Sequence, residues 1–208
     1  MASDHAGALS TPSSTTTTTS IQNYDISRLR QLQNGFPPGF NQVEATAVAT
    51  LGPDADTFFA IGAGDVVAVD PPRCRALLQP VRAPANAQFM MVGGIGEGAI
   101  LVGAVNSPEP LVETTLLAGC DQIAVRQRLS GQQLGWTVTH RPGPSIDGVV
   151  TSESMAVADR EATKSYVLAA FLSRTVAVAV QGVLPGNPDA EDLFQDLLVK
   201  AVNIVRAA

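Results

Sequence analysis

The chain has 208 residues, of which 45% are hydrophobic and 5% aromatic, and it carries a net charge of −6 with a pI near 4.8. This length suits one domain with a substantial core. The chain is acidic and its basic residues are scattered, which argues against a nucleic-acid binder, because these proteins need clustered positive charge. The scarcity of aromatic residues also argues against a protein that stacks the bases of single-stranded nucleic acid.

Residues 1–22 predict a disordered tail, because they are rich in Ser and Thr and poor in the large apolar side chains that offset ordering entropy. The tail has neither the basic start nor the apolar region of a secretory signal. No later segment reaches the roughly 18 apolar residues of a membrane-spanning helix. We expect either a cytoplasmic protein or an exported one whose signal lies outside this chain. The Ser/Thr-rich tether favours export.

Residues 23–208 are predicted to form one domain that begins with a short amphipathic helix over residues 25–34. Asp25 is its expected N-cap, Gly35 its stop, and Ile26, Leu29 and Leu32 share one face. The turn FPPGF at 36–40 then redirects the chain, since two prolines bar helix continuation. Residues 42–50 alternate as in a half-buried strand, although Ala is a poor strand former.

A second short helix is expected near residues 70–80. Asp70 would cap it with proline in its first turn, which would place Cys74, Leu77 and Leu78 on its buried face.

From residue 87 onward the period is mostly two, which is typical of antiparallel strands joined by short turns. The expected strands are 87–92, 99–106, 121–129, 134–141, 149–157, 165–172 and 174–182. The last two form the expected central hairpin, because the link between them is too short for a parallel crossover.

The chain ends in a C-terminal amphipathic helix, with acidic residues at its start and Lys200 and Arg206 toward its end. The fold class is therefore α+β: one domain with a meander-rich antiparallel sheet on which terminal helices and one inserted helix pack.

The segment QFMMVGGIGEGAILVGAV at 88–105 has the strand and glycines with which a dinucleotide-binding loop begins. The stretch after Ala99 is β-branched and soon meets Pro108 and Pro110, so no helix can receive a pyrophosphate. Gly94, Gly96 and Gly98 instead predict a hairpin turn with Glu97 at its tip.

His140, Ser145 and Asp147 supply the residue types of a hydrolase triad within one proline-rich loop. Triad members usually come from separate elements, and the chain has no G-x-S-x-G elbow, so a structural turn is the favoured interpretation. His5 lies in the tail, which leaves His140 as the one histidine of the domain.

Two other features have both a structural and a functional interpretation. The acidic segment PDAD at 53–56 lacks the further oxygen ligands of a calcium loop and is interpreted as a turn. Trp136, in phase with Val138, belongs either to the core or to the wall of a cleft.

Cys74 and Cys120 are too few for a four-ligand zinc site and lack the spacing of a redox motif. They would pair if the domain is exported, and they would otherwise be two buried small hydrophobic residues.

Several segments together resemble a known family: FPPGF at 36–40, DPPRCRALL at 70–78, AGCDQIAV at 118–125, PSIDGV at 144–149, the strand SRTVAVAV and the closing DLLVKAV. They are similar to a domain of unknown function found in exported actinobacterial, chiefly mycobacterial, proteins, many of them lipoproteins. More distantly, the layout is similar to the extracellular sensor domain of a mycobacterial receptor Ser/Thr kinase.

The resemblance implies a disulfide between Cys74 and Cys120 and a place in the cell envelope or outside the cell. It brings no catalytic residues, and this chain lacks the lipobox cysteine of the lipoproteins.

The leading functional hypothesis is a non-catalytic exported domain that binds a small apolar ligand or an envelope protein partner on the sheet face, with no cofactor, metal or nucleic acid. A ligand cleft would be lined by Trp136, Phe89 and Met91. The alternatives are a small envelope hydrolase that uses His140, and a structural or antigenic envelope protein without a ligand.

Overall fold

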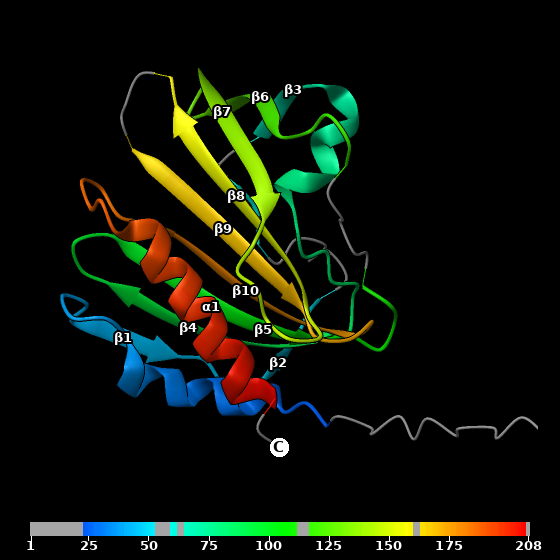
Figure 1. Cartoon of the computed structure of the whole chain (residues 1–208), viewed down its shortest axis with the longest axis vertical. Helices are drawn as coiled ribbons and strands as arrows, with labels where there is room; N and C mark the ends of the chain where they lie inside the picture. Colours follow the sequence, from blue (N-terminus) through cyan, green and yellow to red (C-terminus); the bar gives the residue numbers. More distant parts are fainter. Residues whose placement is uncertain (1–22, 53–58, 62–64, 112–116, 160–162, 207–208) are drawn as a thin grey trace, which may run out of the picture.

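The computed structural model describes residues 23–52, 59–61, 65–111, 117–159 and 163–206. These residues form two 3₁₀ helices, ten strands and one α-helix (Figure 1). In chain order they are η1 (Ile26–Gly35), β1 (Gln42–Ala45), β2 (Ala49–Thr50), β3 (Asp65–Asp70), η2 (Pro72–Leu78), β4 (Gln88–Ile95), β5 (Ala99–Asn106), β6 (Gln122–Leu129), β7 (Gln132–Pro142), β8 (Val150–Ala158), β9 (Lys164–Phe171), β10 (Val176–Val183) and α1 (Ala190–Arg206).

The ten strands form one antiparallel sheet, so the α+β prediction is confirmed. Nine strands follow the order β1-β4-β5-β10-β9-β8-β7-β6-β3, and β2 pairs with β4. The strands from β6 to β10 are a true meander. The β4–β5 hairpin joins that meander through β10, whereas a simple meander would place β5 beside β6.

The β9–β10 hairpin lies at the centre of the sheet, as its sequence indicates. Its pairs run from Ala177 with Phe171 to Val183 with Ser165. Nearly every residue of the two strands is buried, because helices or loops cover both faces there. A strand buried on both faces is a continuous apolar run, which explains the strength of the signal in residues 174–182.

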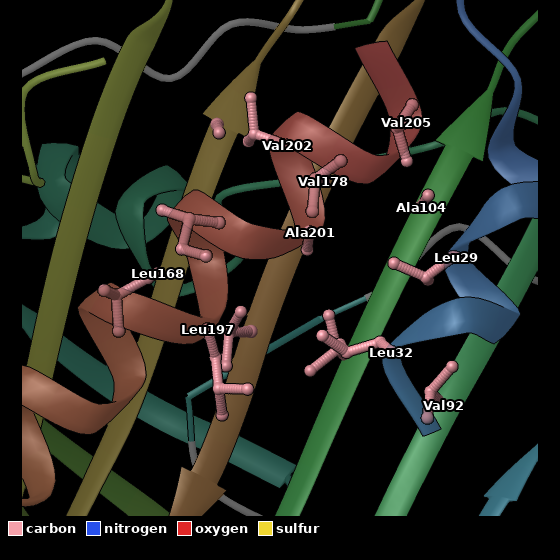
Figure 2. Packing of buried hydrophobic residues seen from close by; sticks show 14 of the residues in the cluster. Leu29, Leu32, Val92, Ala104, Leu168, Val178, Leu197, Ala201, Val202 and Val205 are labelled. Atoms are coloured by element: carbon pink, nitrogen blue, oxygen red, sulfur yellow. The ribbon is translucent and has the colours of Figure 1, made fainter. Parts of the chain in front are cut away.

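One face of the sheet is covered by α1 and η1, which lie next to each other in Figure 1. The Asp25 side chain accepts a hydrogen bond of 2.9 Å from the Ser27 amide and caps η1. Figure 2 shows from close by how η1 and α1 pack on the sheet. Leu29 and Leu32 of η1 and Leu197, Ala201, Val202 and Val205 of α1 meet Val92, Ala104, Leu168 and Val178 from the strands.

The opposite face is covered only in part. A second core joins the buried side of η2, with Cys74 and Leu77, to Ile123, Val125 and Val138 of β6 and β7. A disulfide with a Cα–Cα distance of 5.7 Å joins Cys74 to Cys120 just before β6. The predicted pairing is therefore present, and it fastens η2 to the end of the sheet near β3 (Figure 1).

The glycine-rich segment is the β4–β5 hairpin, as predicted, and Glu97 at its tip is exposed. The strand does not end at residue 92, however, but continues through Gly94 to Ile95. A Cβ on Gly94 would lie 2.3 Å from the Phe36 ring. These glycines do not have positive φ, so Gly94 allows close approach of the FPPGF turn rather than a reversal of the chain.

Two further expectations differ from the structure. The strand expected at 42–50 is divided into β1 and β2. Asp70 does not cap η2: it is the last residue of β3 and pairs with Ala124, and Pro71 occupies the N-cap position without a side-chain hydrogen bond. The tail at 1–22 and the acidic segment at 53–56 lie outside the described residues.

Candidate functional site

An apolar groove with a volume of about 500 Å³ lies over the sheet at the end away from η2. It is formed by β1, β4, β5 and β10. The lining residues are Glu44, Gly93, Gly94, Ile95, Ala99, Ile100, Leu101, Gln181, Gly182 and Val183. Its size falls within the roughly 300–1,000 Å³ range of small-molecule sites.

The strand register explains why these residues meet. Pairing places Glu44 opposite Gly93, Gly93 opposite Leu101, and Leu101 opposite Gln181. This first row crosses four strands on one face of the sheet. A second row beside it runs through Ile95, Ala99 and Val183.

The groove opens on the face opposite α1 and η1. Successive side chains of a strand point to opposite faces. Val43, Val92 and Ile100 pack in the core beneath the helices, so their neighbours Glu44, Gly93 and Leu101 face the other way. The groove is therefore the part of this second face that η2 and its loop do not cover.

The hollow itself follows from two small residues. Gly93 has no side chain and Ala99 has one methyl group, whereas Leu101 is half-buried and Ile95 is 62% exposed. Ile95 has the largest exposed fraction among the exposed large hydrophobic side chains of the described residues.

Two polar side chains belong to the groove. Glu44 lies on the edge strand β1 and Gln181 on the central strand β10, and neither makes a hydrogen bond or ion pair to the described part of the chain. Three strand spacings separate them in the row, or roughly 14 Å. A ligand lying between them would cover apolar surface and meet a polar group at each end.

The predicted cleft residues lie elsewhere on the same face. Phe89 and Met91 are on β4, the strand that also carries Gly93. Trp136 is on β7, with β5, β10, β9 and β8 between the two strands. Phe89 and Trp136 pack against the second core and do not line the groove. A cleft shared by these three side chains stays a prediction.

His140 is 2% exposed. Its Nδ1 lies 2.6 Å from Oγ of Ser154 on the neighbouring strand β8, and its buried Nε2 has no partner among the described residues. Burial lowers the pKa of His140, and the nearby charge of Asp121 opposes this effect. The ring is therefore held neutral at pH 7.

The three residues considered for a hydrolase are not assembled into a catalytic group. Ser145 and Asp147 are in the loop between β7 and β8, and neither is hydrogen-bonded to His140. Ser154, which does contact His140, is 1% exposed. A nucleophile must reach its substrate, and this hydroxyl is enclosed by protein.

A polar cluster around the buried Glu153, at the start of α1, was not predicted from the sequence. Glu153 of β8, 1% exposed, accepts hydrogen bonds of 2.7 Å from Arg141 and 2.8 Å from Gln195. Arg141 also pairs with Glu191 in the first turn of α1. A hydrogen bond to Glu153 is the main cause that raises the pKa of Arg141. The cluster attaches the start of α1 to the sheet. Alternation in residues 150–158 would place Glu153 on one face, but its partners come from distant segments.

The described residues contain no group of three or more His, Cys, Asp or Glu side chains that could hold a metal ion. Among the described helices, none combines the length and the apolar character needed to cross a membrane.

Two solved structures are similar to this one. An uncharacterized protein from Mycobacterium smegmatis, the Rv0999 ortholog, has a TM-score of 0.68 and 22% sequence identity, over 89% of this chain and 98% of that one. The extracellular domain of PknH from Mycobacterium tuberculosis has a TM-score of 0.42 and 11% identity, over 88% of this chain and 94% of that one. The first likeness shows a shared fold.

No curated protein matches the chain significantly in sequence. A family model does match, and its range of residues 25–206 covers nearly the whole described domain. It includes FPPGF and both cysteine segments, so the resemblance seen in the sequence is confirmed. The chain belongs to the DUF5642 family, a domain of unknown function.

Proposed function

We propose that this domain is a non-catalytic exported protein that binds a small apolar or amphipathic ligand in the groove over β1, β4, β5 and β10. The observation that carries the proposal is the groove itself. It is an apolar hollow with a volume of about 500 Å³ on a face of the sheet that η2 and its loop cover elsewhere. Its two polar side chains have no partner in the described part of the chain.

The disulfide supports export. Cys74 and Cys120 are 0% and 1% exposed and are bonded to each other. Disulfides of this structural kind persist in oxidising compartments and are rare in the cytosol. A location outside the cell or in its envelope also suits an apolar ligand, since envelope lipids are available there.

The groove suits binding rather than chemistry. Its lining includes one carboxylate and one amide, and the remaining residues are glycine or apolar. It contains no histidine, cysteine, serine or lysine, and His140 is on β7, four strands from β5. Such a lining orients a ligand and excludes water. Its one carboxylate, Glu44, has no hydrogen-bonded hydroxyl, thiol or imidazole beside it in the described residues, so the groove lacks the paired groups of a catalytic site.

A direct test uses protein that is expressed with export in a mycobacterial host and analysed by native mass spectrometry. We expect a bound apolar molecule on the wild type and its loss in Gly93→Val. A Cβ at Gly93 would lie 3.4 Å from Cδ1 of Leu101, an ordinary contact, so a side chain at this position points into the groove. Thermal unfolding checks that Gly93→Val is folded.

A matched control is Ala124→Val, which adds bulk of the same kind at an exposed position of β6 outside the groove. It should retain the bound molecule. If wild type and Gly93→Val carry the same small molecule, or if neither carries one and the wild type cross-links to an envelope protein, the small-ligand proposal is wrong.

The hydrolase alternative has its own test. A His140→Ala variant and the wild type are compared on panels of ester and peptide substrates. The enclosed Ser154 predicts the same background rate for both. Activity that is present in the wild type and absent in the variant would contradict a non-catalytic role.

A further inference from the structure

We propose that the groove selects amphipathic ligands with a cationic head, such as a long-chain amine, and that Glu44 is the residue that selects them. This inference rests on the proposed function, because it names the ligand class for the same groove. It derives from the place of one charge in an otherwise uncharged lining.

Glu44 is the one charged residue among those that line the groove. Its neighbours Val43 and Ala45 pack against the core beneath the helices, which directs the Glu44 side chain to the groove side of the sheet. The carboxylate makes no ion pair within the described part of the chain. It is free to receive a ligand.

The carboxylate also lies where the head of a ligand would emerge. Glu44 is exposed on the edge strand β1, and the same row continues inward over Gly93 and Leu101 to Gln181. An alkyl chain placed along this row covers Gly93 and contacts Leu101 and Ile95. Its head then reaches the rim beside Glu44, where a charged group keeps part of its hydration.

Charge decides between the alternatives. A carboxylate or phosphate head would meet Glu44 as a like charge, and the net charge of −6 adds to the repulsion. A neutral head would gain a hydrogen bond at most. An ammonium group gains a charge-assisted hydrogen bond to the carboxylate. For a partly exposed pair of this kind we expect about a five-fold gain in affinity.

The test is displacement of the neutral fluorescent probe N-phenyl-1-naphthylamine by dodecylamine, dodecanol and dodecanoic acid, the amine and the acid below their micellar concentrations and the alcohol below its solubility limit. The proteins are wild type, Glu44→Gln and Glu109→Gln. Glu109 is exposed in the loop after β5, at the end of that strand away from the groove. It therefore controls for the loss of one negative charge at a remote position.

In the wild type and in Glu109→Gln, dodecylamine should displace the probe at about five-fold lower concentration than dodecanol, with dodecanoic acid weakest. In Glu44→Gln the preference for the amine should disappear while the affinity for the probe is unchanged. Melting curves by circular dichroism verify that both variants are folded.

The outcomes separate the two proposals. If the probe binds but the three compounds displace it equally from the wild type, or if Glu44→Gln keeps the preference, the cationic-ligand proposal is wrong and the apolar groove stands. If neither the probe nor any alkyl compound binds to the folded wild type, both proposals are wrong.

Discussion

The face of the sheet away from α1 has two ends that differ in construction. Near β6 and β7 this side of the sheet is closed by η2, which the Cys74–Cys120 disulfide fastens in place. At the groove, beside Glu44 and Gly93, none of the described residues covers it, and Gly93 and Ala99 take the place of large side chains. One sheet thus has a sealed end that holds the fold together and an open end with room for a ligand. Stability should depend on the first and binding on the second.

The largest effect should come from opening the sealed end. Replacing both cysteines, Cys74→Ala with Cys120→Ala, removes a cross-link between residues that are 46 positions apart. The chain-entropy model gives a loss of roughly 4 kcal/mol in the free energy of unfolding. Urea denaturation would measure it. A loss below about 1 kcal/mol would show that η2 is held by packing alone.

A second comparison contrasts covered with open leucines. Leu197 of α1 is 1% exposed and packs in the core of Figure 2, so Leu197→Ala should lower the free energy of unfolding by about 3 kcal/mol. Leu101 in the groove is half-buried, and Leu101→Ala should cost less than half as much. Equal losses would mean that the groove residues belong to the core.

Two adjacent glycines sharpen the contrast further. A Cβ at Gly94 would meet the Phe36 ring, so Gly94→Ala should cost about 2 kcal/mol through overpacking. Gly93→Ala points its methyl group into the groove and should change stability by less than about 0.5 kcal/mol. Thermal unfolding of the two variants side by side measures this difference. A larger loss for Gly93→Ala than for Gly94→Ala would mean that Gly93 faces the packed side of the sheet and Gly94 the open side.

The smallest effect concerns His140 and acid. Its folded-state pKa lies below the ordinary value of 6.5 because the ring is buried, so the unfolded chain binds the proton more readily. The stability contribution of the neutral ring is complete above pH 6.5 and is lost as the pH falls through the folded-state pKa. The loss is at most about 1.4 kcal/mol per pH unit.

Urea titrations at about pH 7.5 and pH 5, on either side of the ordinary histidine pKa, would isolate this contribution in wild type, His140→Gln and His5→Gln. The loss between the two pH values should be smaller in His140→Gln and unchanged in His5→Gln, which removes the other histidine of the chain. An identical loss in all three proteins would contradict a neutral buried ring.

Local pattern is enough to predict much of the fold. The strand at 99–106 is predicted to the residue, because its apolar run ends at polar Asn106 and prolines come soon after. The helical face of Ile26, Leu29 and Leu32 is buried as expected. Both signals depend on residues close in sequence, where periodicity and turn chemistry are reliable.

The groove could not be predicted in the same way. Leu101 and Gln181 face each other only because β5 pairs with β10, and nothing in either segment specifies that partner or its register. Gly93 and Gly94 are adjacent glycines that follow the strand expected to end at residue 92, and the local pattern does not distinguish them. Their different roles depend on the group that lies opposite each one: Phe36 against Gly94, and open space beside Leu101 at Gly93.

Probe binding to the groove tests most directly whether the open end of the sheet binds an apolar ligand. N-phenyl-1-naphthylamine is titrated into wild type, Gly93→Val and Ala124→Val. We expect saturable binding to the wild type and to Ala124→Val. The affinity of Gly93→Val should be weaker by at least roughly ten-fold, with all three proteins equally folded. Equal binding to all three proteins, or none to the wild type, would contradict it.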